Sequence, residues 1–318
     1  MGAPSPATTP TPKIFIDGEA GTTGLQIRER LEASGDLALL TIDPAQRKDP
    51  DARKALMAQA QIVVLCLPDD AAREAVALAD TLGDDAPRIV DASTAHRVAD
   101  GWIYGFAELS ETQAARVMTA TRVANPGCYP TGALALLRPL IDAGALPTEA
   151  LITINAVSGY SGGGRTMIET FERGEGPAFE LYGLQLRHKH LPEIHRYSGL
   201  VHRPIFVPSV GTFRQGMLVS IPLHLASLPT QPTLDDLRAI YARAFAGSSW
   251  VKPGVMDGPA ATGRIEPQGL NDSDAMEVFV FGDDALGQAV LVARLDNLGK
   301  GAAGAAVQNI RLMAGLAV

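Results

Sequence analysis

Short apolar runs alternate with helical patterns through the first third of the chain. The runs that predict strands cover residues 14–17, 37–42, 62–67 and 88–91. The helical patterns between them cover residues 25–31, 52–60 and 69–82. Because strands and helices alternate, the order predicts a parallel sheet with helices on both faces, as in a doubly wound α/β domain.

Apolar patterns in the rest of the chain predict a second unit. A helical pattern begins near Cys128, and residues 151–157 and 218–223 are patterned as strands. The C-terminal segment 300–318 predicts a helix that opens with many small residues. Small side chains allow close packing, so we expect this helix to fold back onto the first unit.

The length of 318 residues is sufficient for two domains. We place the first, a dinucleotide-binding domain, at residues 13–127 together with the C-terminal helix, and the second at 128–299. Residues 1–12 are rich in Ala, Pro, Ser and Thr and lack the charged and apolar segments of a signal peptide. We expect them to form a disordered tail.

The composition limits the classes of partner. With 27 Lys and Arg against 35 Asp and Glu, the net charge is −8, which argues against nucleic acid or an anionic membrane as a partner. No apolar run approaches the roughly 20 residues that cross a bilayer. The two cysteines lie in different settings, so they predict no disulfide and favour a reducing cytoplasm.

A cysteine stands at the start of a predicted helix, within residues 125–132, Asn-Pro-Gly-Cys-Tyr-Pro-Thr-Gly. The positive end of the helix and its free N–H groups are expected to lower the pKa of the Cys128 thiol and to stabilise an oxyanion. Cys128 is therefore the candidate nucleophile, with Asn125 as a candidate substrate-binding residue. A buried apolar role is the alternative, and it suits Cys66, which lies in an apolar run.

A glycine-rich loop joins the first predicted strand to its helix. In this order, glycines let the backbone approach a pyrophosphate, and the helix N-terminus complements its charge. The spacing G-x-x-G-x-x-G differs from the commoner G-x-G-x-x-G, and a plain turn is the alternative. The candidate cofactor-binding residues of the loop are Gly18, Gly21, Thr22, Thr23 and Gly24.

Charged residues after the second strand bear on the choice of cofactor. An acidic residue at this place binds the ribose hydroxyls of NAD, whereas a nearby Arg accommodates the 2′-phosphate of NADP. Asp43 is present, but Arg47 and Lys48 follow closely, so we predict NADP with Arg47 as a binding residue; a solvated loop is the alternative. Ser93, just past the fourth strand, is a further cofactor candidate, with a simple Asp/Ser turn as its alternative.

Residues 158–165, Ser-Gly-Tyr-Ser-Gly-Gly-Gly-Arg, are too small to pack a core and predict a loop that approaches a ligand closely. Backbone N–H groups beside Arg165 suit a phosphate, and a flexible surface loop is the alternative. Arg214 stands before a later strand and suits a substrate carboxylate or a surface ion pair. The candidates are Ser158 and Gly159 for the cofactor, and Ser161, Arg165 and Arg214 for the substrate.

Three of the six histidines fall within residues 187–195, Arg-His-Lys-His-Leu-Pro-Glu-Ile-His. A thiolate nucleophile needs an imidazole partner that the fold brings close. We choose His190 as the acid–base residue, with His188 as the second choice and Glu193 as an orienting carboxylate. A zinc site lacks further ligands of convincing spacing, so we expect no metal.

Taken together, these motifs resemble the N-acetyl-gamma-glutamyl-phosphate reductase family, from Lys13 to near the C-terminus. The segments that carry the resemblance are 125–131, 158–162, 190–194 and 300–309, and the opening 15–24 is similar to the shorter, type 2 branch. The resemblance implies a Rossmann-type domain followed by an α+β catalytic and dimerisation domain of the semialdehyde dehydrogenase kind. In the last motif, Asn309 is a further cofactor candidate.

The resemblance also implies a reaction, the semialdehyde-forming step of arginine synthesis. Cys128 would attack the acyl phosphate of N-acetylglutamyl 5-phosphate, NADPH would reduce the resulting thioester, and His190 would relay protons. The implied partners are this small-molecule acyl phosphate or its semialdehyde and further copies of the chain, in a homodimer or homotetramer. The alternatives are another phosphorylating semialdehyde dehydrogenase, of the aspartate type, and a non-catalytic NADP-binding sensor.

Overall fold

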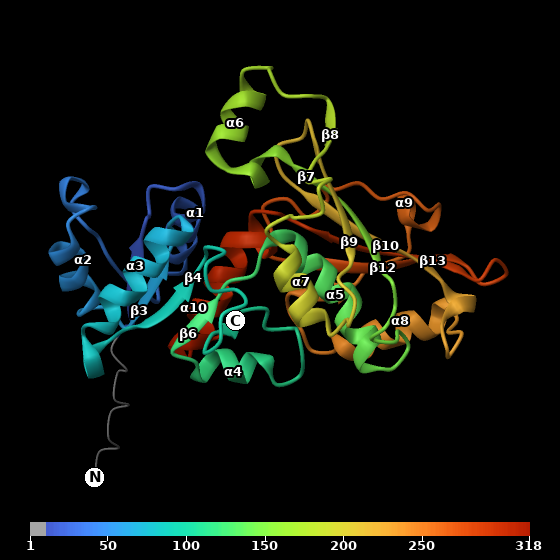
Figure 1. Ribbon diagram of the computed structural model, residues 1–318, viewed down its shortest axis with the longest axis horizontal. Helices are drawn as coiled ribbons and strands as arrows, with labels where there is room; N and C mark the ends of the chain where they lie inside the picture. The colour runs from blue at the N-terminus through green and yellow to red at the C-terminus, as the bar shows by residue number, and fades with distance from the viewer. Residues whose placement is uncertain (1–10) are drawn as a thin grey trace, which may run out of the picture.

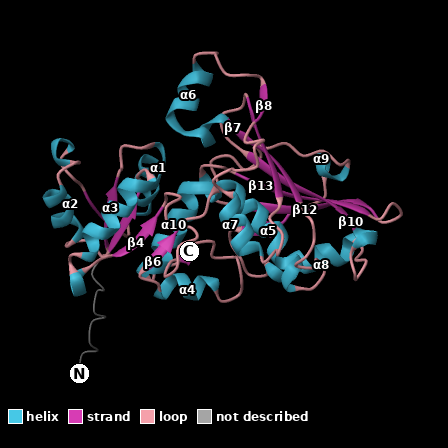
Figure 2. Ribbon diagram, in the orientation of Figure 1, coloured by secondary structure: helices cyan, strands magenta, loops and turns pink. Residues whose placement is uncertain are grey.

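Two β-sheets, each with its own helices, organise the computed structural model, which describes residues 11–318 (Figure 1). The first sheet lies in the left half of the view and the second in the right half, and the chain enters the second half through helix α5 (Cys128–Asp142) (Figure 2). Except for its last two residues, the predicted tail at 1–12 lies outside the described residues. No helix within residues 11–318 is long and apolar enough to cross a membrane.

The first sheet is parallel throughout, with the strand order β2-β1-β3-β4-β6-β5. Its strands are β1 (Lys13–Asp17), β2 (Ala38–Leu40), β3 (Ile62–Leu65), β4 (Arg88–Asp91), β5 (Ile103–Tyr104) and β6 (Arg122–Ala124). Its helices are α1 (Thr22–Ser34), α2 (Pro50–Met57), α3 (Asp69–Asp80) and α4 (Gln113–Thr119). Strands β1, β3 and β4 are almost wholly buried, as expected of the continuous apolar runs of a covered parallel sheet. The predicted doubly wound α/β domain is confirmed.

The second sheet is mixed, with the strand order β11-β12-β13-β10-β7-β9-β8. Its strands are β7 (Thr153–Gly159), β8 (Phe179–Leu181), β9 (Ile205–Gly211), β10 (Met217–His224), β11 (Val251–Pro253), β12 (Met276–Asp283) and β13 (Gln288–Leu295). The helices of this half are α5, α6 (Gly164–Glu172), α7 (Leu191–Ser198), α8 (Leu234–Ala244) and α9 (Gly258–Ala261). Helices α5 and α8 pack on the sheet and α7 packs on α5, so that one apolar core lies between helices and strands.

Helix α10 (Gly304–Ala314) returns the end of the chain to the first sheet. Its apolar face packs in one cluster with residues of strands β1, β3, β4 and β6. A π-helical turn (Gly299–Ala303) leads into α10 and lies against the start of α5. A Cβ added to Gly301 would lie 2.8 Å from the Cβ of Cys128, so only glycine allows this turn to pack so closely behind the cysteine.

The glycine- and serine-rich segment 158–165 is more ordered than the predicted loop. Strand β7 extends into it, and a 3₁₀ turn (Tyr160–Gly163) leads directly into α6. Phe171 of α6 stacks on Tyr160 with 4.8 Å between ring centroids. The prediction of a loop over the whole segment is therefore wrong. Its first two residues end strand β7, and its last two, Gly164 and Arg165, already belong to helix α6.

Candidate active site

A cavity of about 430 Å³ lies where the two halves of the molecule meet, at the first residue of α5. Both halves contribute to its walls, through the first residues of α1, the turn before α6, the segment before α7 and the turn before α10. The sequence-predicted residues that line it are Thr22, Thr23, Asn125, Cys128, Ser158, Gly159, Ser161, His188 and His190.

Cys128 is the first residue of α5. Gly127 is the N-cap, and no side chain caps the helix. The backbone carbonyl of Gly127 accepts hydrogen bonds from the backbone N–H of Thr131, at 3.0 Å, and from its hydroxyl, at 2.9 Å. This first turn therefore holds the thiol at the end of the helix and leaves uncapped N–H groups beside it, where a developing oxyanion can accept hydrogen bonds.

Burial raises the pKa of the Cys128 thiol to about 11. The backbone N–H of Tyr129 and the charges of Arg97 and Lys189 oppose this shift, as expected at a helix N-terminus, but they do not overcome it. The prediction of a lowered pKa is therefore wrong, because desolvation of the thiolate outweighs the helix. At neutral pH the thiol carries its proton and needs a base.

His190 supplies an imidazole beside the cysteine loop. It is the N-cap of α7 and is buried, and its Nε2 lies 2.6 Å from the position that a Cβ on Gly127 would occupy. Burial, followed by the charge of Arg97, lowers the pKa of His190 well below its usual value. The imidazole is therefore neutral at pH 7 and free to accept a proton. Its Nδ1 is buried and has no hydrogen-bond partner within the described part of the chain.

His188 supports the backbone of His190. Its Nδ1 accepts a hydrogen bond from the His190 backbone N–H at 3.1 Å, which places the proton of the neutral ring on Nε2. Burial lowers the pKa of His188 to about 4, with a further contribution from the charge of Lys189. His188 also lines the cavity, so the geometry gives it a supporting place and His190 the place next to the nucleophile loop.

Glu193 lies on the first turn of α7 and is almost fully buried. Its carboxylate accepts hydrogen bonds from Arg97 Nη1 at 2.7 Å, from the Tyr104 hydroxyl at 2.7 Å and from the Gly127 backbone N–H at 3.1 Å. Arg97 Nε donates in turn to the carbonyl of Asn125 at 3.0 Å. The pair of Glu193 and Arg97 therefore fixes the loop that precedes Cys128 from two sides.

Sequence reasoning missed Arg97 and Asn297. Arg97 lies beyond the fourth strand, close to Ser93, and no local pattern in the sequence distinguishes this buried arginine from the exposed ones. Asn297 lines the cavity, donates from Nδ2 to the Ser161 hydroxyl at 2.9 Å and accepts from the Gly216 N–H at 2.8 Å. Its only sequence signal is its place just before the glycine- and alanine-rich segment.

The glycine loop before α1 fits a dinucleotide pyrophosphate. Gly21 is the N-cap of α1 and no side chain caps this helix, which leaves the first-turn N–H groups free of side-chain acceptors. Gly18 has a φ of +91°, and a Cβ on it would lie 2.4 Å from the carbonyl oxygen of Cys66. A Cβ on Gly24 would lie 2.7 Å from the carbonyl oxygen of Gly18. Larger residues at these two positions would therefore clash with backbone atoms and disrupt the tight turn of the loop.

A second hollow beside this loop is lined by Arg28 and Arg47 among others. Glu19 pairs with both guanidinium groups, at 2.6 Å for Arg28 and 3.5 Å for Arg47. The carboxylate of Asp43 accepts a hydrogen bond from the backbone N–H of Ala45 at 2.9 Å and so caps the following 3₁₀ turn. The hollow therefore holds two guanidinium groups, each already paired with a carboxylate, while the acidic residue predicted to favour NAD is engaged in its own turn.

Two further predicted cofactor residues, Ser93 and Asn309, lie outside the cavity lining and form hydrogen bonds within the protein. Ser93 donates its hydroxyl hydrogen to Asp91 Oδ2 at 2.8 Å, the arrangement of an Asp/Ser turn. Asn309 is fully buried in α10 and donates from Nδ2 to the carbonyl of Gly105 at 2.9 Å and to Asn125 Oδ1 at 3.0 Å. Asn309 therefore ties the C-terminal helix to the residue that begins the cysteine motif, rather than facing a ligand.

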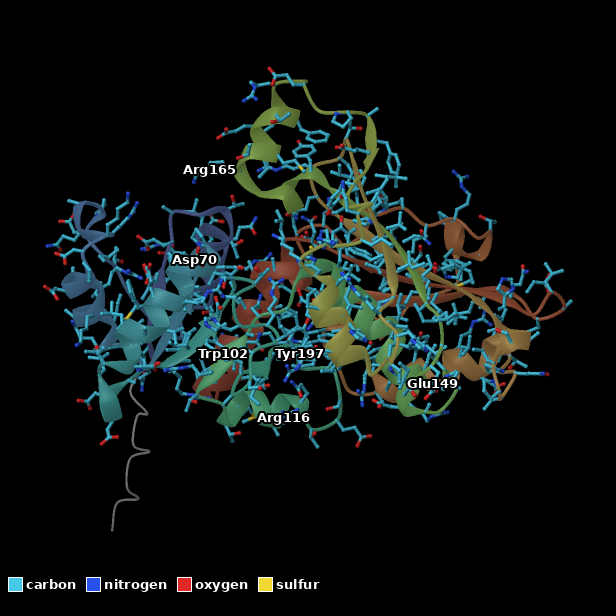
Figure 3. All side chains as sticks on the ribbon, viewed as in Figure 1. Asp70, Trp102, Arg116, Glu149, Arg165 and Tyr197 are labelled. Carbon is cyan, nitrogen blue, oxygen red and sulfur yellow. The ribbon has the colours of Figure 1, made fainter. Side chains whose placement is uncertain are left out.

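Two predicted substrate residues are also placed elsewhere. Arg165 extends from α6 on the side that faces the first sheet, and its Nη2 donates to the carbonyl of Ala20 in the glycine loop at 2.9 Å (Figure 3). Arg214 forms an ion pair with Glu172 at 3.6 Å, with 61% of its side chain exposed, and does not line the cavity. Because both side chains are exposed, Arg214 forms a surface ion pair, which was the alternative to its predicted role in binding a substrate carboxylate.

Comparisons with known proteins agree with this architecture. The family model described as semialdehyde dehydrogenase, dimerisation domain, matches residues 128–297. The solved aspartate semialdehyde dehydrogenase II of Vibrio cholerae has a TM-score of 0.71 at 15% identity, covering 96% of this chain and 99% of that one. The enzyme of Francisella tularensis has a TM-score of 0.72 at 11% identity, covering 95% and 100%. At these identities the likeness shows the fold, and the predicted semialdehyde dehydrogenase architecture is confirmed.

Sequence relatives are much closer. N-acetyl-gamma-glutamyl-phosphate reductase of Chelativorans sp. is 52% identical over 307 residues, which cover 95% of this chain and 98% of that protein. N-acetyl-gamma-glutamyl-phosphate reductase 2 of Pseudomonas putida is 49% identical over 308 residues, covering 96% and 97%. Half of all positions are thus shared along nearly the whole length of both chains. This chain belongs to the N-acetyl-gamma-glutamyl-phosphate reductase family.

Proposed function

We propose that this protein reduces N-acetyl-L-glutamyl 5-phosphate with NADPH to N-acetyl-L-glutamate 5-semialdehyde and phosphate, a step of arginine biosynthesis. The near full-length relatives carry the name of this reaction. The observation that carries the chemistry is the position of Cys128 at the N-terminus of α5, in one cavity with His190 and the first residues of α1.

In the first half of the reaction, the proton of the Cys128 thiol passes to Nε2 of His190 as the sulfur attacks the acyl carbon. The C–S bond forms, the bond from the acyl carbon to the phosphate oxygen breaks, and the His190 proton passes to the departing phosphate. The product on the enzyme is a thioester. Uncapped N–H groups at the start of α5 stabilise the negative charge on the tetrahedral oxygen.

In the second half, NADPH, when bound, supplies the hydride that reduces the thioester carbon. The uncapped N–H groups of α5 again hold the negative oxygen of the tetrahedral species. Collapse of that species breaks the C–S bond, releases the aldehyde and leaves the Cys128 thiolate, which regains a proton through His190. Glu193 and Arg97 hold the cysteine loop in place throughout.

We infer NADP rather than NAD from the residues that line the second hollow. Arg28 and Arg47 face it from two elements, and Thr41 adds a hydroxyl. A 2′-phosphate carries about two negative charges and forms strong hydrogen bonds with guanidinium groups. Glu19 pairs with both arginines and Glu32 also pairs with Arg28, so these carboxylates orient the guanidinium groups and offset their charge. The hollow therefore favours a 2′-phosphate over a free 2′-hydroxyl.

The oligomeric state is the remaining part of the proposal. The matched family model is described as a dimerisation domain, and large apolar side chains are exposed on the outer strands of the second sheet, at Phe179, Leu181 and Ile205. Exposed apolar residues that gather on one sheet mark an interface. We therefore expect a homodimer or homotetramer, which light scattering behind a sizing column would distinguish from a monomer.

The decisive assay is reduction of NADP by N-acetyl-L-glutamate 5-semialdehyde in the presence and absence of phosphate. Wild type should require phosphate, and Cys128→Ser should lose the activity because an alcohol is a far weaker nucleophile than a thiolate. Turnover of aspartate semialdehyde in place of the acetylated aldehyde would overturn the substrate assignment and keep the mechanism. Inactivity with both aldehydes would overturn the mechanism as well.

A further inference from the structure

Two cations line the active-site cavity, and they differ in what they contact. Arg97 is only 8% exposed, and its charge is matched by Glu193 at 2.7 Å. Lys189 also lines the cavity but is exposed, and it forms no ion pair within 4.0 Å and no side-chain hydrogen bond with any described residue. Lys189 is therefore the cavity cation whose charge remains available to a ligand.

The backbone of Lys189 is held on both sides. It lies between His188 and His190, which are joined by the hydrogen bond from the His190 N–H to His188 Nδ1. The charge of Lys189 contributes to the lowered pKa values of both histidines and opposes the raised pKa of Cys128. These effects place the ammonium group within electrostatic range of the reacting atoms, although its side chain is exposed.

The substrate of the proposed function carries two anionic groups at different distances from the reacting carbon. The phosphate is bonded to that carbon, whereas the α-carboxylate lies on the far side of the acetamido-bearing carbon, three carbons along the chain. Arg97 lies next to the cysteine loop, with Nη1 2.6 Å from the position of a Cβ on Gly127, and so stands beside the reacting carbon. The more exposed Lys189 suits the anion at the far end.

We propose that Lys189 binds the α-carboxylate of the substrate and thereby makes the enzyme prefer aldehydes and acyl phosphates that carry one. This inference rests on the proposed function and names the residue that recognises one part of its substrate. Lys189 acts as a specificity residue, because the bond-making steps assigned to Cys128 and His190 proceed without it.

The test compares two aldehydes in the phosphate-dependent reduction of NADP. One is N-acetyl-L-glutamate 5-semialdehyde, and the other is 4-acetamidobutanal, which lacks only the carboxylate. Lys189→Met should lower kcat/KM for the first by about 10-fold, the lower end for a charge-assisted contact at an exposed site, and should change the second less than 2-fold. The KM for inorganic phosphate should remain at its wild-type value.

The control is Arg187→Met, which removes a cation from the same segment at a residue that does not line the cavity. It should leave kcat/KM unchanged for both aldehydes, which separates a specific contact from a general loss of positive potential. Equal losses with both aldehydes after Lys189→Met would overturn the proposal, and so would a raised KM for phosphate alone. An inactive wild type would instead overturn the proposed function, so the two failures are distinguishable.

Discussion

Replacing Glu193 by Gln should destabilise the protein and displace its nucleophile. The substitution keeps the size of the side chain but removes the charge opposite Arg97 and one of the oxygens that accept from Arg97, Tyr104 and Gly127. Removing one partner of a buried ion pair strands the other, at a cost of about 3–5 kcal/mol. Arg97 is 8% exposed, so we expect a loss in this range in the free energy of unfolding.

A double-mutant cycle isolates the pair from the packing around it. Arg97→Gln alone should cost a similar free energy, because it strands the buried Glu193 carboxylate. The double variant has two neutral amides and no stranded charge, so it should lose at least about 2 kcal/mol less than the sum of the two single losses. Urea unfolding followed by circular dichroism, at one protein concentration, gives the three values.

The same variants should show that the pair also positions the nucleophile, apart from its contribution to the free energy of unfolding. Gly127 donates to Glu193 and directly precedes Cys128, and a displacement of about 1 Å at a reacting group can cost on the order of 100-fold in rate. We therefore expect kcat to fall by about that factor in Glu193→Gln at a temperature where the variant is folded. Additive unfolding losses, or a wild-type kcat in both single variants, would refute the role given to the pair.

Four further predictions follow from the site. Iodoacetamide should alkylate Cys128 slowly at pH 8, where a thiol of pKa about 11 is only on the order of 0.1% thiolate, and faster at each higher pH; rapid labelling below pH 8, read by mass spectrometry, would contradict the raised pKa. The profile of kcat/KM should fall on the acid side only below about pH 6.5, since His190 must be neutral to accept a proton and burial lowers its pKa. His190→Asn should reduce turnover by at least about 100-fold and more than His188→Asn does; the reverse order would reassign the proton relay. Arg47→Ala should raise the KM for NADP by about 10-fold and leave that for NAD unchanged, and equal effects on both cofactors would remove the basis for NADP.

The parts of the fold that depend on neighbouring residues could be predicted from the sequence. Strand β1, the glycine loop and α1 are contiguous, and apolar runs with a glycine turn between them suffice to predict all three. The same holds for the start of α5, since the proline and glycine before Cys128 mark a helix N-terminus by local geometry alone. The candidate nucleophile could be predicted from the sequence because Cys128 lies within one of these contiguous segments.

The parts of the site that depend on tertiary contacts could not be predicted from the sequence. Glu193 meets Arg97 across 96 positions of the chain, and no pattern in either segment marks the partner. Whether Arg214 faces a substrate or Glu172 depends on where the end of α6 lies relative to the loop between β9 and β10, and no pattern in the glycine-rich segment before α6 predicts that. The raised pKa of Cys128 is of the same kind, because burial causes it, and the turn that packs behind the cysteine lies about 170 residues later in the chain.

Burial acts on the two central groups in opposite directions and so sets how the reaction begins. It raises the pKa of Cys128 and lowers that of His190, because in each case the low-dielectric surroundings disfavour the charged form. The stable state of the pair is therefore thiol and neutral imidazole, not thiolate and imidazolium. The thiolate is needed only when an acyl carbon is present, and proton transfer can then accompany formation of the C–S bond. Such a nucleophile is protected from alkylation and oxidation between turnovers, which a cysteine with a permanently lowered pKa would not be.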